Sequence, residues 1–293
     1  MSIDSTTSEV RVSIMRTTIG VVTVNVDKPS ITSNMVSSLA KDNPDIKFCV
    51  VDNGSDSQNY VLLIQRLSYL GNVIVKRLEQ QASIGKAFNI GIMTLAEQVS
   101  LIVLMHNNCF IDKTNLHRLA QTLMLNDSKI SIIAPLIMSY YNPKEIWSAG
   151  HSRRLWRGDT KPYTQKFNVE TLDGPYYARC VSLACMMVKS YVFRKVGYLD
   201  EFLAGNEEAD FCLRAWRGHC RVAVDPRSRA YHMVGTTSKI AGGSRGPIKP
   251  NLVVSAVPAY FRFLFKNSSR AQMVSSIIFR GMTLPRTLRD LSQ

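Results

Sequence analysis

Residues 48–55 read FCVVDNGS and join an apolar, partly β-branched run to an Asp-Asn-Gly turn. This combination predicts a buried strand that ends in a turn. Runs of the same strand type lie on both sides along the chain, at 19–26, 73–78, 101–105 and 130–137. Segments with helical periodicity separate them, at 31–41, 58–70, 84–97 and 113–126. Strands that alternate with helices in this way predict an α/β fold with right-handed crossovers and a mostly parallel sheet.

The pattern changes after about residue 138. Residues 139–175 are rich in Tyr, Trp, Arg, Gly and Pro, which predicts a long loop or a small hairpin. Beyond it we expect a strand-like segment at 176–189, a short helix at 190–197, a helix at 206–218 and a strand at 221–226. One or two amphipathic helices are expected over 251–280, with a break near Pro258. Residues 1–15 are expected to be a loose leader.

The charge of the chain is uneven. Of its 293 residues 45% are hydrophobic and 20% are charged, which is typical of a globular protein with a substantial core. The net charge of +14 is concentrated near the C-terminus, because residues 227–293 hold 11 Lys and Arg against one acid, Asp290. Such a bias favours an anionic partner, which could be a lipid surface, a polyphosphate or a nucleic acid. A solvated basic surface without a partner is the alternative.

Cysteine spacing and hydropathy bear on the compartment. The six cysteines include no C-x-x-C pair, which argues against a zinc ribbon or a redox motif. The N-terminus has no apolar core of the signal-peptide type. No uninterrupted apolar run reaches the ~18 residues that a membrane-spanning helix needs. We therefore expect a reduced, cytoplasmic protein, which its basic C-terminus could hold peripherally at a membrane.

Ligands of parallel sheets bind at the carboxyl ends of the strands, so the side chains that follow each strand are candidates for a binding site. Asn25, Asp52 and Asn53 follow the first two strands. A carboxylate at Asp52 can accept hydrogen bonds from the N–H of a nucleobase or from a ribose hydroxyl, and the tight turn lets a planar ring approach the backbone. A plain turn is the alternative interpretation, because Asp-Asn-Gly is a strong turn signal.

The stretch SIGKAFNIG, residues 83–91, begins a predicted helix after the third strand. The N–H groups at the start of a helix, together with Lys86, could neutralise a phosphate. The glycine spacing matches neither the G-x-G-x-x-G pattern nor the Walker A pattern, so neither a Rossmann dinucleotide site nor a P-loop is supported. An ordinary amphipathic helix with a polar start is the alternative.

The stretch LIVLMHNN, residues 101–108, ends a buried strand at an edge where many enzymes place a metal-binding carboxylate. This chain has His106, Asn107 and Asn108 there. An amide oxygen is a poorer ligand for Mg²⁺ or Mn²⁺ than a carboxylate, because hard cations prefer charged oxygen. The sequence thus leaves open a metal site without its acid, a metal site built differently, and no metal site.

The stretch AGNEEADFCLRAWRGH, residues 204–219, places Glu207, Glu208 and Asp210 at the start of a predicted helix. Acids at that position interact favourably with the helix dipole, which is the simple interpretation. Three neighbouring acids also repel one another, which raises the pKa of one toward the range of a general base or favours a bound cation. Arg214, one turn after Asp210, is expected to pair with it. His232 lies after the last strand, where a lone histidine is more often structural than a ligand.

Taken in order, these motifs resemble the family-2 glycosyltransferases with the GT-A fold, from about residue 19 to 238, and look closest to the bacterial rhamnosyltransferase-like branch. The resemblance rests on Asn25, VDNGS (51–55), GKAFNIG (85–91), LMHNN (104–108), NPKEIWSAG (142–150), CMMVKSYVFRKVGYLDE (185–201), GNEEADFCLRAWRGH (205–219) and YHMVGTTS (231–238). Each motif alone is weak, whereas their order and spacing are specific. The resemblance implies a Rossmann-like, mostly parallel sheet with helices on both faces, and C-terminal amphipathic helices beyond it.

The family also implies an inverting transfer from a nucleotide-sugar donor, in which an acceptor hydroxyl attacks the anomeric carbon opposite the leaving diphosphate. Carried over by position, Asp52 would meet the base of the donor, and Glu208 would be the general base. The other donor-binding candidates are Asn25, Asn53, Lys86, Asn89, His106 and Asn107. Glu207 and Asp210 complete the catalytic cluster. Asn108 stands where the family has its metal-binding acid, and His232 matches a histidine that in some relatives approaches the metal or the diphosphate.

Three outcomes follow for the cofactor. Asn108 and the diphosphate could hold Mn²⁺ or Mg²⁺ weakly, with help from His106 or His232, since Mn²⁺ tolerates imidazole. Basic residues could replace the metal in stabilising the leaving diphosphate. The protein could also bind a nucleotide sugar without turnover.

The donor and the acceptor are predicted only as classes. Asp52 suits the N3–H of uracil or thymine, so a UDP- or dTDP-sugar is preferred over a GDP-sugar. The acceptor is expected to be a glycan or a lipid-linked glycan, near an anionic membrane surface. A hydroxylated base of modified DNA is the alternative acceptor, motivated by the basic C-terminus and by Arg153, Arg154, Arg157, Lys161 and Lys166. We expect a glycosyltransferase domain over 16–240, with a nucleotide-binding half at 16–138 and an acceptor half at 139–240, followed by a basic helical extension at 241–293.

Overall fold

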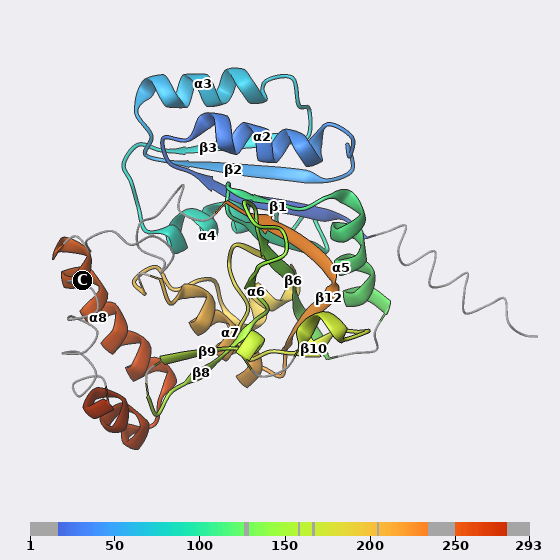
Figure 1. Cartoon of the computed structure of the whole chain (residues 1–293). Coiled ribbons are helices and arrows are strands. Elements are labelled where there is room, and N and C mark those ends of the chain that lie inside the picture. Colours follow the sequence, from blue (N-terminus) through green and yellow to red (C-terminus); the bar gives the residue numbers. More distant parts are fainter. Residues whose placement is uncertain are drawn as a thin grey trace, which may run out of the picture.

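The computed structural model describes residues 17–125, 129–157, 159–165, 168–203, 205–233 and 250–279 (Figure 1). Several predictions from the sequence fall outside these residues. They concern the leader at 1–15, Lys166, the VGTTS part of the last motif at 234–238, and the outer parts of the C-terminal extension at 241–249 and 280–293.

The first half of the chain alternates strands and helices as predicted, apart from a two-residue strand at 109–110 that was not predicted. Its elements are β1 (Ile19–Asn25), α2 (Pro29–Ala40), β2 (Lys47–Asn53), α3 (Ser57–Leu67), β3 (Val73–Leu78), α4 (Ile84–Leu95), β4 (Leu101–Met105), β5 (Cys109–Phe110), α5 (Lys113–Leu125) and β6 (Ile130–Ser139). Three of these helices begin with a side-chain cap: Asp56 accepts from the N–H of Asn59 in α3, Ser83 accepts from the N–H of Lys86 in α4, and Asp112 accepts from the N–H of Asn115 in α5.

The strands form one ten-stranded mixed sheet. Its main order is β10-β12-β6-β11-β4-β1-β2-β3, in which β10 is Tyr176–Tyr177 and β12 is Arg221–His232. Strands β3, β2, β1 and β4 are parallel neighbours, as are β6 and β12. Strand β11 (Cys185–Lys189) lies antiparallel between β4 and β6. The predicted α/β fold with a mostly parallel central sheet is therefore confirmed, with an antiparallel strand inserted at its centre.

Two apolar layers cover the two faces of the sheet. Because successive side chains of a strand point to opposite faces, Val21 and Val50 pack in one core cluster, while Val22 and Val51 pack in the other. The first cluster contains side chains of α2, α3 and α5, and the second contains side chains of α4, α6, α7 and α8. Figure 1 shows α2 and α3 above β2 and β3, with α4 below them. All six cysteines are buried and free, as expected of small apolar side chains.

The second half adds shorter elements. They are β7 (Ile146–Ser148), β8 (His151–Arg154), β9 (Asp159–Pro162), the 3₁₀ turns Tyr163–Gln165 and Val169–Thr171, β10 (Tyr176–Tyr177), α6 (Tyr191–Val196), α7 (Glu207–Arg217) and β12 (Arg221–His232). The small hairpin expected within 139–175 is the antiparallel pair of β8 and β9.

Two predicted strands have different bounds. The segment 176–189 is a strand only at its two ends, because 178–184 connects β10 to β11. The strand expected at 221–226 continues to His232, with a register shift between Asp225 and Arg229. This continuation is stabilised by β6 and by β5, whose Cys109 pairs with His232. Both partners lie far away in the sequence, so local pattern does not reveal them.

The C-terminal helices differ from the prediction in one point. Helix α8 (Pro250–Asn267) contains Pro258 within it, so the break predicted there is wrong. The chain leaves the helical conformation instead at residues 268–269 and forms a second helix at 270–279. Phe263 and Leu264 are fully buried, and α8 contacts α7. This packing offsets the hydrogen bond that a proline removes from a helix. Among the described residues, no helix is both long and apolar enough to span a membrane.

Candidate active site

The carboxyl ends of β1 and β2 hold a buried network around Asp52. Asn25 and Asp52 are register partners in this parallel pair. The Nδ2 of Asn25 donates to Oδ1 of Asp52 at 2.8 Å and to Oγ of Ser55 at 3.1 Å, and Ser55 Oγ donates to the same Oδ1 at 2.6 Å. The other carboxylate oxygen of Asp52, Oδ2, is buried and has no hydrogen-bond partner. A buried acceptor without a partner is rare, and it is available to an N–H or O–H of a ligand.

Thr32 links this network to the end of β4. Its Oγ1 donates to Oδ1 of Asn25 at 2.6 Å and accepts from Nδ2 of Asn107 at 2.9 Å. Both Asn107 and Thr32 are buried. Asn107 was predicted from its position after β4, whereas Thr32 lies inside α2 and carries no motif that could have identified it. Together they fix the side-chain orientation of Asn25.

Asn53 holds the loop that follows β3. Its Nδ2 donates to the carbonyl of Ala82 at 3.0 Å, and its Oδ1 accepts from the N–H of Ala82 at 2.8 Å. The next residue, Gly54, has φ +74°, and a Cβ there would lie 2.3 Å from the backbone nitrogen of Gln81. Only glycine allows this close approach of the two turns. The predicted contact of Asn53 with a donor would thus have to involve its backbone, because its amide is engaged.

Asn89 fastens α4 to the segment that leads into α7. Its Nδ2 donates to the carbonyl of Leu199 at 2.9 Å, and its Oδ1 accepts from the N–H of Leu199 at 3.0 Å. Its Nδ2 also lies 3.2 Å from Oε1 of Glu201. Asn89 therefore joins the two halves of the site. Lys86, one turn earlier in α4, is exposed, so its ammonium group can reach a ligand.

The ends of β4 and β12 bring His106, Asn108 and His232 together. Asn108 donates through Nδ2 to the carbonyl of Met233 at 2.8 Å, so its Oδ1 faces Nε2 of His232 at 3.1 Å. His232 must then carry its proton on Nε2, which leaves a lone pair on Nδ1. This Nδ1 is buried and has no partner. The ring of Trp147 lies against His232 with the ring centroids 4.4 Å apart.

Both histidines are neutral at pH 7. Burial lowers the pKa of His232 to about 4. Burial and, after it, the neighbouring His232 lower the pKa of His106 to about 3. The two ring centroids are 5.7 Å apart. Neutral imidazoles can accept a hydrogen bond or bind a metal ion, but they do not supply positive charge.

The N-terminus of α7 carries the predicted catalytic acids. Because α7 leads directly into β12, which is parallel to β6, its first turn lies at the same edge as the carboxyl ends of the strands. Glu207 is buried; its Oε2 accepts from the N–H of Gly205 at 2.7 Å, while its Oε1 has no partner. Glu208 is partly buried, and burial and then the charge of Glu207 raise its pKa to about 7. Burial also raises the pKa of Glu207.

Arg153 of β8 lies beside these acids. Its guanidinium donates to Oδ1 of Asn206 at 2.5 Å and to Oγ1 of Thr160 at 3.0 Å, and it lies over the ring of Phe263 at 4.6 Å. Its charge partly opposes the rise in the pKa of Glu208. It was predicted only as part of a basic loop, and its place here depends on the fold of the β8–β9 hairpin.

Asp210 belongs to a different environment. It is fully buried, and it accepts from Nε of Arg214 at 2.8 Å and from Nδ2 of Asn267 at 2.9 Å. The Nζ of Lys266 lies 3.2 Å from its Oδ1. The expected Asp210–Arg214 pair is confirmed. These partners direct the carboxylate of Asp210 toward α8, whereas Glu207 and Glu208 are free of such ion pairs in the described part of the chain.

A second carboxylate, Asp200, also binds α8. It accepts from Lys266 at 2.6 Å and from Arg262 at 3.2 Å. Burial alone would raise the pKa of Asp200, but the hydrogen bonds from Lys266, from the N–H of Phe202 and from Arg262 outweigh it and lower the pKa to about 2. Two ion pairs therefore hold α8 against the segment that carries the acids.

The model of the family described as glycosyl transferase family 2 matches residues 18–193. This range covers more than half of the chain. The chain belongs to glycosyl transferase family 2. The search of curated proteins by sequence gave no match.

Solved glycosyltransferases share the fold. The crystal structure of GalNAc-T7 with UDP, GalNAc and Mn²⁺ superposes with a TM-score of 0.65 at 17% identity, over 85% of this chain and 48% of that chain. The structure of S. aureus TarS 1–349 gives a TM-score of 0.55 at 12% identity, over 90% of this chain and 71% of that one. Its complex with UDP-GlcNAc gives 0.55 at 15% identity, over 90% and 72%. This family-2 chain thus spans about half the length of GalNAc-T7, and the likeness shows the GT-A fold.

The residues at the predicted metal position, His106, Asn108 and His232, include no carboxylate. Among the described residues no three His, Cys, Asp or Glu side chains form a group that could hold a metal. The Oδ1 of Asn108 accepts from Nε2 of His232, so Asn108 favours the tautomer of His232 that carries its proton on Nε2. A carboxylate-rich site of the kind Mg²⁺ prefers does not fit. The unpartnered Nδ1 of His232 fits an ion that tolerates imidazole, such as Mn²⁺.

Proposed function

We propose that this family-2 chain is an inverting glycosyltransferase that moves a sugar from a UDP- or dTDP-sugar to a hydroxyl of a glycan or lipid-linked glycan. The sugar is a hexose or deoxyhexose, as in the rhamnosyltransferase-like branch, and the enzyme works in the cytoplasm. One observation carries the proposal: Asp52, Glu207 and His232 each leave a buried polar atom without a partner. Such atoms need an explanation, and a bound donor and acceptor would supply the missing partners.

The donor base would bind at the end of β2. The Oδ2 of Asp52 is an acceptor, which matches the N3–H of uracil or thymine. Asn25, Ser55 and Thr32 hold the carboxylate in place for this contact. The solved complexes of GalNAc-T7 and TarS contain UDP and UDP-GlcNAc, which supports a UDP-sugar here. Lys86, exposed at the start of α4, would bind a phosphate of the donor.

Glu208 would act as the general base. A carboxylate with a pKa of about 7 takes up a proton far more readily than an ordinary glutamate, yet it is still ionised in a substantial fraction at neutral pH. It would take the proton of the acceptor hydroxyl as this oxygen attacks the anomeric carbon and the nucleoside diphosphate leaves from the opposite face. Glu207 supports this role, because its charge raises the pKa of Glu208. We assign Asp210 to the attachment of α8 and not to the reaction.

A divalent ion would bind at Nδ1 of His232. When bound, it would neutralise charge on the leaving diphosphate. Asn108 would keep Nδ1 unprotonated by accepting from Nε2. The same ion class is present in the GalNAc-T7 complex, which contains Mn²⁺.

The proposal is tested by a thermal-shift screen of UDP-, dTDP- and GDP-sugars, each with Mn²⁺, with Mg²⁺ and with EDTA. A ligand that binds the native state stabilises it by mass action. We expect stabilisation by a UDP- or dTDP-sugar, larger with Mn²⁺ than with Mg²⁺ or EDTA, and slow release of the nucleoside diphosphate with water as acceptor. No stabilisation by any nucleotide sugar would contradict the donor assignment.

The metal assignment has its own control. His232→Ala should remove the additional stabilisation that Mn²⁺ gives to the nucleotide-bound protein, because it removes the ligand atom. His117→Ala in α5 should leave that increment unchanged. Equal stabilisation of the wild-type protein in Mn²⁺ and in EDTA would mean that Lys86, Arg153 or other basic residues take the place of the metal.

A further inference from the structure

Helix α8 exposes an apolar stripe. Val257, Phe261 and Phe265 lie four residues apart, so they share one face of the helix. Their side chains are 49%, 45% and 80% exposed. Phe263, two residues after Phe261 and fully buried, attaches the opposite face of the helix to the core. Exposed phenylalanines in a row are unusual for a protein surface in water and indicate an interaction site.

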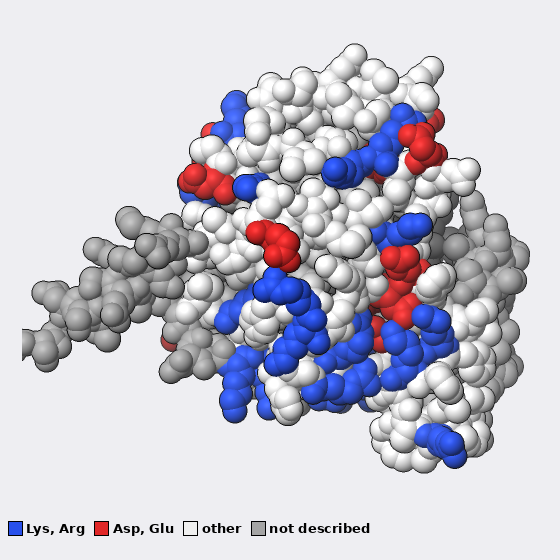
Figure 2. Space-filling model, turned by 180° about the vertical axis from the view of Figure 1, so that it is seen from behind, with Lys and Arg blue, Asp and Glu red and all other residues white. Residues whose placement is uncertain are grey.

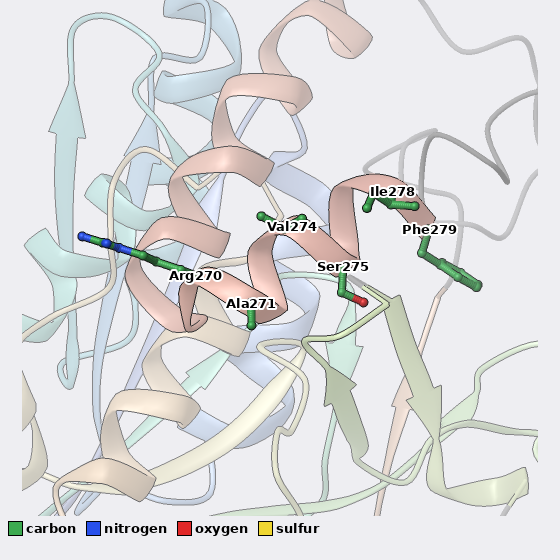
Figure 3. A pocket seen from close by; sticks show the side chains of 6 residues that line it. All are labelled: Arg270, Ala271, Val274, Ser275, Ile278 and Phe279. Atoms are coloured by element: carbon green, nitrogen blue, oxygen red, sulfur yellow. The ribbon is translucent and has the colours of Figure 1, made fainter.

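The helix at 270–279 also exposes apolar side chains. Val274 and Ile278 are each 54% exposed, and Figure 3 shows their side chains on the same side of the helix. With Arg270, Ala271, Ser275 and Phe279 they line an open groove of about 630 Å³. A hydrogen bond attaches this helix to the segment after β8, because Oγ of Ser275 donates to the carbonyl of Trp156 at 2.9 Å. The indole of Trp156 is itself largely exposed.

Basic side chains flank this surface, of which Arg262 and Lys266 already pair with Asp200, and Lys266 also with Asp210. The helical residues 250–279 include Arg262, Lys266 and Arg270 and contain no acid. Arg217 of α7 is exposed and donates to Oδ1 of Asn267 at 2.6 Å. This basic side chain therefore lies at the end of α8. Figure 2 shows that Lys and Arg side chains predominate on the lower half of that face, next to the C-terminal helices.

The presence of both exposed apolar and basic side chains distinguishes between two kinds of anionic partner, nucleic acid and membrane. Nucleic acid binds Lys and Arg through its phosphates, but an aliphatic and phenyl stripe adds little to such binding. A lipid interface uses both, because apolar side chains enter the acyl boundary while basic groups contact anionic headgroups. A helix of this kind lies in the plane of the interface, in agreement with the finding that no described helix is long and apolar enough to cross a bilayer.

We propose that Val257, Phe261 and Phe265 of α8, together with Val274 and Ile278, insert into the surface of an anionic membrane. The proposal does not depend on the glycosyltransferase activity. It does give that activity an orientation: Asp200 and Asp210 bind α8 directly, so the face that meets lipid is attached to the start of α7. A lipid-linked acceptor would then approach the site from the side of the membrane.

The test is sedimentation of the full-length protein with vesicles of phosphatidylcholine, alone or mixed with phosphatidylglycerol. We expect binding to the mixed vesicles, weaker binding to phosphatidylcholine alone, and weakening as salt rises. Phe261→Ser/Phe265→Ser should reduce the affinity at least about tenfold, because the variant loses two inserted phenyl groups. Val61→Ser is the matched control, since Val61 is 51% exposed on α3, away from α8 (Figure 1), and should bind like wild type.

A labelled variant tests insertion even if the double variant is unstable. Phe265→Cys carrying a polarity-sensitive fluorophore should shift to shorter wavelength with mixed vesicles, and Val61→Cys with the same label should not. The six native cysteines are buried, which favours selective labelling. Three outcomes would overturn the proposal. They are no binding to mixed vesicles at low salt, equal binding of the double variant and wild type, and loss of a dimer or of duplex-DNA binding in the double variant without any change in vesicle binding.

Discussion

Asp52 at the end of β2 and Glu208 at the start of α7 are both carboxylates at the same edge of the sheet, but their surroundings differ. Asp52 is buried and accepts two hydrogen bonds at Oδ1, from Asn25 and Ser55, which fix the orientation of its carboxylate. Glu208 is desolvated next to Glu207, which favours its protonated form and brings its pKa to about 7. The first environment suits a group that binds a ligand N–H or O–H at a fixed position through its unpartnered Oδ2. The second suits a group that exchanges a proton, so the environment and not the residue type separates the two roles.

Glu208→Gln should have the largest effect and should sharpen this contrast. If Glu208 is the base, turnover measured as release of nucleoside diphosphate should fall about 10²- to 10⁴-fold, because glutamine cannot take up the proton. Donor affinity, measured by titration calorimetry, should stay close to that of wild type, since the base acts on the acceptor. Full turnover in this variant would show that Glu208 is not the general base.

Asp210→Asn tests whether the third acid belongs with α8. The substitution removes one partner of a buried ion pair with Arg214 and Lys266, which costs about 3 kcal/mol of the free energy of unfolding. Chemical denaturation measures this loss. Glu97→Gln is the control, because its pair with Arg194 is exposed and should contribute less than about 1 kcal/mol. If Asp210→Asn keeps its stability but loses turnover, Asp210 takes part in the reaction and does not serve mainly to attach α8.

Asp52→Asn should have a smaller effect, confined to donor binding. Asn25 and Ser55 donate to Oδ1, so the new side chain must keep its oxygen there and turn its NH₂ group toward the vacant side. The NH₂ group, a hydrogen-bond donor, would then face the N3–H of the nucleobase where the wild-type carboxylate offers a hydrogen-bond acceptor. We expect a loss of about 1.5–3 kcal/mol in donor affinity by calorimetry. Asp56→Asn, at the exposed cap of α3, should bind the donor as wild type does. If the Asp52→Asn variant binds the nucleotide sugar with unchanged affinity, the nucleobase does not bind at Asp52.

The sequence predicted the first half of the fold well, because its signals are local. Strand-type runs and helical periodicity located β1 to β4, β6 and the helices between them within a few residues, but not the two-residue strand β5. The helix break at Pro258 was wrong, because the packing of Phe263 and Leu264 against the core keeps α8 continuous. The extension of β12 to His232 depends on β6 and β5, which local pattern cannot show.

The candidate site shows the same division. Residue type and strand position sufficed to propose Asp52 and the acids of α7, and their roles remain predictions. Sequence could not show that Asp210 turns to Asn267, that Asn53 pairs with Ala82, or that Asn89 pairs with Leu199. In each case the partner is brought near by the fold, and a side-chain amide or carboxylate that looks free in the sequence is already engaged.

The most direct test of the account is the pH dependence of diphosphate release at saturating donor, in wild type and in Glu207→Gln. The active form of Glu208 is ionised, so the rate should rise about tenfold per pH unit below its pKa of about 7 and level off above it. Removing the charge of Glu207 should move this rise to lower pH, since that charge raises the pKa of Glu208. A rate that does not change between pH 5 and pH 8, or a rise that stays in place in Glu207→Gln, would contradict the assignment of Glu208 as the base.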